Sequence, residues 1–347
     1  MIRYGKSAQD ILGFKQDFFE SNDRLRDDLL KINRRYAEQP RRILCKLCTE
    51  KLPDQPKFTK HEVKYFICTR CGHLNGAYED TKEFCSALYA DDSGRDYAKT
   101  YSSSDKDIYF KRVEQIYVPK AKFLAEALRE QGAEPNRLTY TDLGAGSGYF
   151  VAALRGIGLD QVTGYEVSES QVDLATKMLS GRHVVRHELD ALDAIIQGIN
   201  SDVVSMIGVL EHVTNPREVL ERLCANKGVE YVYISVPLFS TSVFIEMAFP
   251  DVMPRHLAAA HTHLFTESSL RWMANEYKMD RVSEWWFGTD IVDLFRSMTV
   301  MLQKSSQTHD VATDWQSMFA PLLDEMQIVL DKRKMSSEIH ALFKLKR

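Results

Sequence analysis

Apolar residues are spaced in two different ways along this chain, and the change falls near residue 139. Between residues 7 and about 38 they recur at steps of three, four or seven, which is the spacing of one helix face. This stretch predicts one or two helices that pack on their own domain, with a dimerisation helix as the alternative. A second helical pattern opens at Asp105 and reaches about Gln131, with Pro119 inside it.

From Thr139 onward, short apolar runs are separated by helical patterns. The predicted strands cover residues 139–143, 162–167, 184–187, 202–207 and 231–236. Strands that alternate with helices at this spacing form a parallel sheet with helices on both faces. The second half of the chain is therefore predicted to be an α/β domain.

Length and composition divide the chain further. A chain of 347 residues corresponds to about two domains. We expect a helical segment over residues 1–42, a cysteine-rich segment over 43–80, a polar, Tyr-rich connector over 81–104 and the α/β domain over 105–347. The composition, 44% hydrophobic and 27% charged, is that of an ordinary globular protein.

Nothing in the sequence indicates a membrane or an export signal. The longest apolar run, residues 238–249, is short and interrupted by polar residues, so no membrane span is expected. Residues 1–21 lack the apolar core of a signal peptide, so the expected location is the cytoplasm. In that reducing compartment, six Cys are expected to be thiols or metal ligands.

Four of the six Cys form two Cys-x-x-Cys pairs, Cys45 with Cys48 and Cys68 with Cys71. Four thiolates close a tetrahedral Zn²⁺ site with no open position, which makes such a site structural. Gly72 follows the second pair and suits the tight turn of a zinc knuckle. The spacing predicts a small zinc ribbon, with four unliganded thiols or a redox pair as the alternatives.

A glycine-rich loop follows the first strand of the α/β domain, in the order Asp142, Leu143, Gly144, Ala145, Gly146, Ser147, Gly148. Glycines between a strand and a helix let a ligand approach the backbone and the free N–H groups of the helix. The dinucleotide pattern G-x-G-x-x-G would need Gly at Tyr149, so a pyrophosphate ligand is not favoured. Glu166 ends the second strand, where an acid binds both ribose hydroxyls of an adenosine.

This loop, with Glu166 downstream, resembles the first motif and the partner acid of class I S-adenosylmethionine-dependent methyltransferases. The segments 208–213 and 263–270 are similar to the family's segments after its fourth and fifth strands. The resemblance covers about residues 105–347. It implies a Rossmann-like sheet of seven strands that ends in an antiparallel hairpin, for which residues 281–288 and 339–346 are the candidates.

The resemblance also implies a set of contacts with S-adenosylmethionine. Asp142 and the backbone of Gly144, Ala145 and Gly146 would face the methionine part. Glu166 would hold the ribose, and Val167 would lie against the adenine. Leu189 and Asp190 would lie near the amino edge of the adenine, and Gly208 would border the sulfonium.

Glu211 and His212 follow the fourth strand, just before a predicted helix start at Asn215 and Pro216. Ligands bind at that edge of a parallel sheet, and His is suited to remove a proton from a methyl acceptor near neutral pH. A Glu–His pair resembles that of sugar C-methyltransferases and quinone-type O-methyltransferases. We therefore expect His212 and Glu211 to be catalytic or to position the acceptor, the alternative being that they brace the loop and pack.

Other candidate residues carry weaker signals. His256, His261 and His263 are expected near the acceptor, as packed residues or acceptor contacts in preference to a metal triad. Tyr97 and Tyr101 of the connector are more typical of surface or core residues than of ligand contacts. Cys85 and Cys224 are expected to be ordinary buried thiols.

A cysteine segment ahead of such a domain resembles two arrangements, one in bacterial sugar C-methyltransferases and one in certain ribosomal-RNA guanine methyltransferases. The sugar enzymes usually carry a further large carboxy-terminal domain, which the residues after 288 are too few to form. The net charge of −4 disfavours RNA, since RNA-binding proteins are usually basic. The function favoured is methylation of a small acceptor, best a sugar or nucleotide-sugar, at carbon or oxygen, by a monomer or homodimer. The alternatives are RNA methylation through the zinc ribbon and a catalytically silent regulatory fold.

Overall fold

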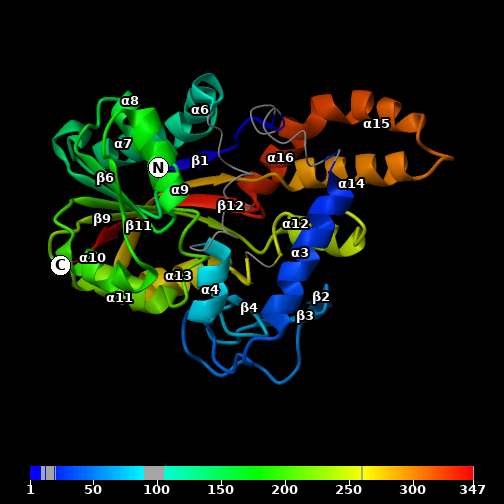
Figure 1. Ribbon diagram of the computed structural model, residues 1–347, viewed down its shortest axis with the longest axis horizontal. Coiled ribbons are helices and arrows are strands. Elements are labelled where there is room, and N and C mark those ends of the chain that lie inside the picture. The colour runs from blue at the N-terminus through cyan, green and yellow to red at the C-terminus, as the bar shows by residue number, and fades with distance from the viewer. Residues whose placement is uncertain (9–11, 13–18, 20, 90–104, 259–260, 347) are drawn as a thin grey trace.

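The computed structural model describes residues 1–8, 12, 19, 21–89, 105–258 and 261–346. Most of these residues form one α/β unit with a large twisted sheet, and the cysteine-rich segment lies at one end of it (Figure 1). Tyr97 and Tyr101 lie outside the described residues. In the described part of the chain, no helix is both long and apolar enough to cross a membrane.

The large sheet has eight strands, in the order β1, β11, β12, β9, β8, β5, β6, β7. Their bounds are Ile2–Tyr4 (β1), Tyr140–Leu143 (β5), Val162–Glu166 (β6), Val184–Arg186 (β7), Val203–Ile207 (β8), Tyr231–Pro237 (β9), Met279–Phe287 (β11) and Glu338–Leu345 (β12). The strands from β7 to β9 are parallel, as the alternating pattern predicts.

The antiparallel end of the sheet is also as expected. β12 lies between β9 and β11 and is antiparallel to both, and Arg281 is opposite Phe343. The predicted number of strands was wrong, because β1 adds an eighth strand parallel to β11. β1 falls inside the segment predicted to be helical. Three residues are too few for an alternating pattern, so only the free edge of β11 determines this strand.

Helices cover both faces of the sheet. On one face, α6 (Lys106–Arg112), a π-helical turn (Val113–Tyr117), α7 (Val118–Glu130), α8 (Tyr149–Gly156) and α9 (Glu169–Leu179) enclose one core. On the other face, α10 (Leu192–Gly198), α11 (Pro216–Ala225) and α13 (Glu267–Glu276) enclose a second core. Successive residues of β9 alternate between these cores, as side chains of a strand must: Tyr231 and Tyr233 face the first, Val232 and Ile234 the second.

The predicted helix starts are present. The carboxylate of Asp105 accepts hydrogen bonds from the N–H groups of residues 107 and 108, and the amide oxygen of Asn215 accepts one from the N–H of Glu218. Pro119 lies in the first turn of α7, where its missing N–H costs nothing. Short 3₁₀ turns occupy Pro135–Arg137, Leu189–Ala191 and Ala320–Leu322.

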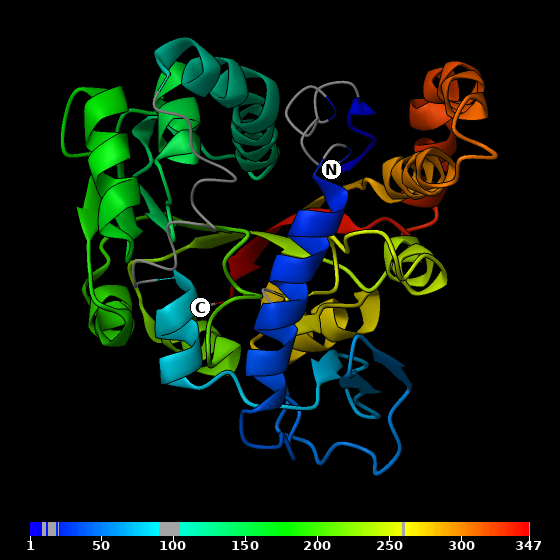
Figure 2. The ribbon, with the colours of Figure 1, turned by 45° about the vertical axis from the view of Figure 1, so that its right-hand side comes forward.

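The remaining elements lie around the carboxyl edge of the sheet. The amino-terminal helix α3 (Asn22–Ala37) crosses from the region of α14 (Asp290–Lys304) to the cysteine-rich segment (Figures 1 and 2). Helices α4 (Lys82–Tyr89) and α12 (Thr241–Ala248) flank it, while α15 (Val311–Phe319) and α16 (Leu323–Lys332) complete a helical arm with α14. Tyr36 of α3 is buried against Phe84 of α4, so α3 packs on its own chain.

The cysteine-rich segment has a sheet of its own, in the order β10, β4, β3, β2. Strands β2 (Phe58–Lys60), β3 (Val63–Ile67) and β4 (Leu74–Gly76) come from this segment, whereas β10 (His263–Leu264) comes from the chain after β9. The two parts also share a core, in which Cys45 and Leu47 pack with residues of α13 and the large sheet. The segment is thus continuous in space with the α/β domain.

Candidate active site

The glycine loop leaves the end of β5, the strand at which the order of the parallel strands reverses. This is the switch point at which doubly wound sheets bind ligands. Gly144 has a φ of +65°, and a Cβ added there would lie 2.5 Å from a methyl carbon of Val209. Only glycine fits this position, because the loop folds back against the segment that follows β8.

Glu166 ties the glycine loop to the end of β6. One carboxylate oxygen accepts a hydrogen bond from the N–H of Gly146 at 2.8 Å. The other accepts from the N–H groups of Val167 and Ser168, both at 2.9 Å. Each carboxylate oxygen has two lone pairs, so Oε2 of Glu166 can accept one more hydrogen bond from a ligand while the side chain orders both loops.

A continuous cavity of about 800 Å³ opens beside these loops, at the carboxyl edge of the parallel strands. All the residues expected to contact the cofactor or the acceptor line it: Asp142, Gly144, Ala145, Gly146, Glu166, Val167, Leu189, Asp190, Gly208, Glu211 and His212. They come from the ends of β5, β6, β7 and β8. The cavity is large enough for a nucleoside cofactor and a second small molecule.

Asp142 is buried at the base of the glycine loop. Its carboxylate accepts a hydrogen bond of 2.6 Å from the hydroxyl of Ser205 on β8. Burial nevertheless raises the pKa of Asp142 to about 7, because the hydroxyl offsets only part of the lost hydration. Asp142 is therefore poised to ionise when a cationic group approaches it.

The far end of the cavity is formed partly by a helix that the sequence did not associate with the site. Lys82 of α4 forms an ion pair of 2.9 Å with Asp190, and Cys85 of the same helix also lines the cavity. Both side chains of the ion pair are exposed, so the pair contributes little stability. It does bring α4 to the rim where the adenine end of a nucleoside is expected.

Glu211 and His212 line the same cavity, directly after β8. Glu211 is only 3% exposed, and burial raises its pKa to about 8. Its Oε1 lies 3.8 Å from Nε2 of His212, and a Cβ at Gly208 would lie 3.6 Å from the same oxygen. The Glu–His pair is therefore adjacent to the glycine expected to border the sulfonium.

The three clustered histidines separate in space. His261 lies beside His212, with ring centroids 5.0 Å apart, and its Nδ1 donates a 2.7 Å hydrogen bond to the carbonyl of His256. Burial lowers the pKa of His261 to about 4, so its ring is neutral. His256 also lines the cavity, but its Nε2 donates to the carbonyl of Leu238 at 2.7 Å.

His263 faces away from this group. Its Nδ1 lies 2.8 Å from Nε2 of His73 in the cysteine-rich segment, and both rings are buried. His256, His261 and His263 therefore do not converge on one point, since the ring of His256 donates to Leu238, that of His261 to His256, and that of His263 contacts His73.

Several residues of the cavity wall could not be predicted from the sequence. Lys120 of α7 and Glu338 of β12 lie 3.5 Å apart, and Arg255 pairs with Asp293 of α14 at 2.8 Å. Thr289 completes this polar wall. These residues come from widely separated segments, so only the folded chain brings them together.

The four cysteines of the two pairs meet in the cysteine-rich segment. Sγ of Cys45 lies 3.6 Å from that of Cys71, and Sγ of Cys48 lies 3.4 Å from that of Cys68. A tetrahedral Zn²⁺ with Zn–S bonds of about 2.3 Å requires sulfur separations of about 3.8 Å. The sulfurs therefore fit such an ion with small adjustments.

The backbone around these cysteines also suits a metal. The two pairs form matching knuckles, with the N–H of Thr49 bonded to the carbonyl of Cys45 and that of Gly72 to the carbonyl of Cys68, both at 2.9 Å. The neighbouring Cys68 raises the pKa of the Cys45 thiol to about 12, since a second thiolate in contact with the first is disfavoured. Only a cation would let all four sulfurs ionise together.

Three contacts connect the cysteine-rich segment to the acceptor wall. β4 pairs with β10, which begins two residues after His261 in the chain. The hydroxyl of Thr262 donates to Asp80 at 2.6 Å. Lys60 forms a fully buried ion pair of 3.0 Å with Glu246, whose carboxylate also accepts the N–H groups of residues 255, 256 and 257. The segment that carries the cysteines thus supports the loop that carries His256 and His261.

The chain is similar to several solved structures at low identity. The plantazolicin methyltransferase BpumL, in complex with SAH, shares 15% identity with a TM-score of 0.45, over 76% of this chain and 94% of that one. The magnesium protoporphyrin IX methyltransferase ChlM from Synechocystis PCC 6803, with bound SAH, shares 16% identity with a TM-score of 0.45, over 60% of this chain and 94% of that one. A putative sarcosine dimethylglycine methyltransferase from Galdieria sulphuraria shares 15% identity with a TM-score of 0.46, over 74% of this chain and 99% of that one.

Sequence comparison identifies the domain that contains the site. No curated protein matches the chain in sequence. The family model described as "Methyltransferase domain" matches residues 111–283, about half of the chain. The matched residues include the glycine loop, Glu166 and the Glu211–His212 pair. Residues 111–283 therefore match the methyltransferase domain family, and the chain is a methyltransferase.

Proposed function

We propose that this enzyme transfers the methyl group of S-adenosylmethionine to a small polar acceptor, a sugar or nucleotide-sugar, at carbon or oxygen. The observation that carries the proposal is the character of the cavity beyond Gly208. Its wall there combines Glu211, His212, His261 and Arg255, all of which offer hydrogen bonds to a hydroxyl-rich molecule. These four polar side chains suit a sugar better than an apolar quinone.

In this proposal the cofactor occupies the end of the cavity formed by the glycine loop and Glu166. Asp142 and the backbone of Gly144, Ala145 and Gly146 face the methionine part, and Glu166 binds the ribose hydroxyls. Val167, Leu189 and Asp190 surround the adenine, and Gly208 borders the sulfonium. The continuity of one cavity past all these residues supports the assignment.

The chemistry at the acceptor end follows from the nature of methyl transfer. A bond forms between the acceptor atom and the methyl carbon while the carbon–sulfur bond breaks, and the acceptor loses a proton. Glu211 holds its own proton near neutral pH because its pKa is raised, so it is suited to orient a hydroxyl. His212, which lies beside it, is the proposed proton acceptor.

The proposal includes a structural Zn²⁺ held by Cys45, Cys48, Cys68 and Cys71. Four thiolates leave no open position on the ion, so it would supply stability and no step of the reaction. The sulfur separations and the matching knuckles support this assignment. The cytoplasm remains the expected location.

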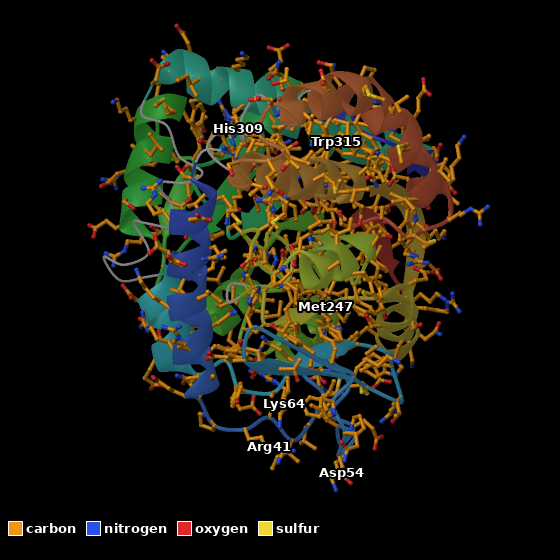
Figure 3. All side chains as sticks on the ribbon, turned by 90° about the vertical axis from the view of Figure 1, so that its right-hand side faces the viewer. Arg41, Asp54, Lys64, Met247, His309 and Trp315 are labelled. Atoms are coloured by element: carbon orange, nitrogen blue, oxygen red, sulfur yellow. The ribbon has the colours of Figure 1, made fainter. Side chains whose placement is uncertain are left out.

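The central experiment compares His212→Ala with the control His309→Ala, which changes an exposed histidine between α14 and α15 on the helical arm (Figure 3). Loss of a general base costs about 10²- to 10⁴-fold in kcat. We expect kcat of His212→Ala to fall in that range, with S-adenosylmethionine affinity by calorimetry within about twofold of wild type. Equal losses of turnover and cofactor affinity would contradict the role of His212, and His309→Ala should match wild type in both.

The acceptor class is tested directly with methyl-labelled cofactor. Nucleotide-sugars, free sugars, phenolic acceptors and RNA are each incubated with the enzyme, and the label in each product is counted. We expect label in the sugar compounds. Label confined to phenolic acceptors or RNA would contradict the proposal, and failure to bind S-adenosylmethionine at all would favour the regulatory alternative.

A further inference from the structure

We propose that Glu211, His212 and His261 form a second metal site, which binds a divalent transition-metal ion at the acceptor end of the cavity. One potential ligand atom from each side chain lies within 4.8 Å of the other two. His261 comes from the loop before β10, while the other two follow β8, so the chain brings them together only by folding. The site is separate from the four cysteines.

The orientation of His261 is that of a metal ligand. Its Nδ1 donates to the carbonyl of His256, which leaves the lone pair of the neutral ring on Nε2. Metal-binding histidines are commonly fixed in this way, through a hydrogen bond from the other ring nitrogen to a carbonyl. The loop around His256 is itself fixed, because the ring of His256 donates to Leu238.

Glu211 provides an independent observation that points to a ligand. The side chain is 3% exposed, and its Oε2 accepts no hydrogen bond from any residue that the structure describes. A buried carboxylate oxygen without a partner is costly, and the cost is removed when a cation binds it. The same carboxylate lies 3.8 Å from the imidazole of His212 through its other oxygen.

The donor set determines the kind of ion. Two imidazoles and one carboxylate favour Zn²⁺, Mn²⁺, Fe²⁺ or Co²⁺ over Mg²⁺ or Ca²⁺, which prefer oxygen ligands alone. Ligands at about 2.1 Å from an ion lie about 3 to 3.5 Å apart. The potential ligand atoms lie within 4.8 Å of one another, so they would close by up to about 1.8 Å on binding. Three protein ligands leave at least one position open toward the cavity.

This inference deepens the proposed function and, for its catalytic consequence, rests on it. With an ion bound, Glu211 would release its proton to solvent, and His212 would be a ligand in place of the proton acceptor. The open position of the ion would bind an acceptor hydroxyl. The ion would lower the pKa of that hydroxyl, whose proton would then pass to solvent as oxygen attacks the methyl carbon. The acceptor atom would accordingly be an oxygen of a sugar.

Mn²⁺ is the probe of choice because it disfavours thiolates and so discriminates against the cysteine site. Binding of Mn²⁺ to the full chain is measured by electron paramagnetic resonance and calorimetry, for wild type, Glu211→Gln, His261→Asn and the control His309→Asn. We expect one bound ion in wild type and in the control. Loss of a direct ligand should weaken binding by about 100-fold or more, since loss of even a ligand's supporting contact costs about 10- to 100-fold.

Folding and cofactor binding are followed in the same samples. Far-UV circular dichroism and S-adenosylmethionine affinity should be unchanged in Glu211→Gln and His261→Asn, which keep nearly the shape of the native side chains. The metal proposal is overturned if folded wild-type protein binds no Mn²⁺, or if both variants bind it as tightly as wild type. These readouts need no acceptor, so this failure is distinct from the failure of the proposed function, which is the absence of methyl transfer to sugars.

Discussion

The three buried carboxylates of the cavity have different hydrogen-bond partners. Glu166 accepts three backbone N–H groups, Asp142 accepts a single hydroxyl, and Glu211 has one oxygen without a partner among the described residues. Burial raises the pKa of Asp142 to about 7 and that of Glu211 to about 8. Such shifts concentrate at functional sites.

The pKa of Asp142 predicts a pH dependence of cofactor binding. In the proposed binding mode, the methionine ammonium would pair with the ionised carboxylate of Asp142, which is present above about pH 7 and is lost as the pH falls through that value. Affinity for S-adenosylmethionine should therefore level off above about pH 7.5 and fall by up to about tenfold per unit below about pH 6.5. Calorimetry across this range measures it.

The control for this prediction is Asp142→Asn, which cannot ionise and keeps the contact with Ser205. Its affinity should be lower than that of wild type at pH 8 and nearly independent of pH. A slope that persists in Asp142→Asn would assign the pH dependence to another group.

A second residue-scale prediction concerns the buried pair of Lys60 and Glu246, each 3% exposed at the side chain. Removal of one partner from such a pair leaves the other charge buried and uncompensated, at a cost of about 3 to 5 kcal/mol. Lys60→Met should lose about this free energy of unfolding in urea. The matched variant Lys64→Met, on the exposed face of β3, should change it by less than about 0.5 kcal/mol. Equal effects of the two variants would contradict the importance of the pair.

At the scale of elements, the cysteine-rich segment is a support for the acceptor half of the cavity. Its β4 holds β10, and its Lys60 holds the carboxylate that orders residues 255–257. Among the described residues, no comparable contact joins the cysteine-rich segment to the glycine loop. That loop follows β5 and packs against the ends of β6 and β8. Loss of the proposed Zn²⁺ should therefore affect the two halves of the cavity differently.

Cys48→Ser tests this separation, with Cys224→Ser, a half-buried cysteine outside the cluster, as the control. We expect Cys48→Ser to lose zinc, by elemental analysis, and to lower the melting temperature. Methyl transfer should fall by at least about tenfold while S-adenosylmethionine affinity stays within about threefold of wild type. A parallel loss of cofactor affinity would show that the segment supports the whole molecule rather than one wall.

At the scale of the whole molecule, the balance of charge argues against a nucleic-acid substrate. The net charge is −4, with 45 Lys and Arg against 49 Asp and Glu. The exposed basic residues Arg41 and Lys64 and the exposed acidic residue Asp54 lie at one end of the molecule, in or next to the cysteine-rich segment (Figure 3). A surface of mixed sign does not provide the phosphate contacts that dominate RNA affinity.

This balance predicts the result of an RNA-binding experiment. Micromolar protein should produce no gel shift of structured RNA at about 100 mM salt. If the cysteine-rich segment served RNA, a shift would appear that weakens steeply as salt rises, and Arg41→Ala would reduce it. That outcome would favour the RNA-methylating alternative over the sugar acceptor.

The α/β class, the parallel strands and the glycine loop with its partner acid could be predicted from the sequence alone, whereas the antiparallel end of the sheet was expected only from the family resemblance. The features predicted from the sequence alone depend on local patterns: apolar periodicity, glycines between a strand and a helix, and an acid at a strand end. The carboxyl ends of parallel strands meet at one edge, so the order of strands and loops along the chain is enough to place the residues from Asp142 to His212 at one site. The two Cys-x-x-Cys pairs are likewise a local signal.

Tertiary structure alone decided which distant residues complete the acceptor end. β1 joined the sheet because β11 had a free edge, although its three residues carry no pattern of their own. His261 separated from His263 because β10 pairs with β4, which directs one ring toward the cavity and the other toward His73. Lys120 and Glu338 met across the core without any sequence signal. Contacts between segments far apart in the chain depend on how the layers pack, and the sequence of any one segment does not encode them.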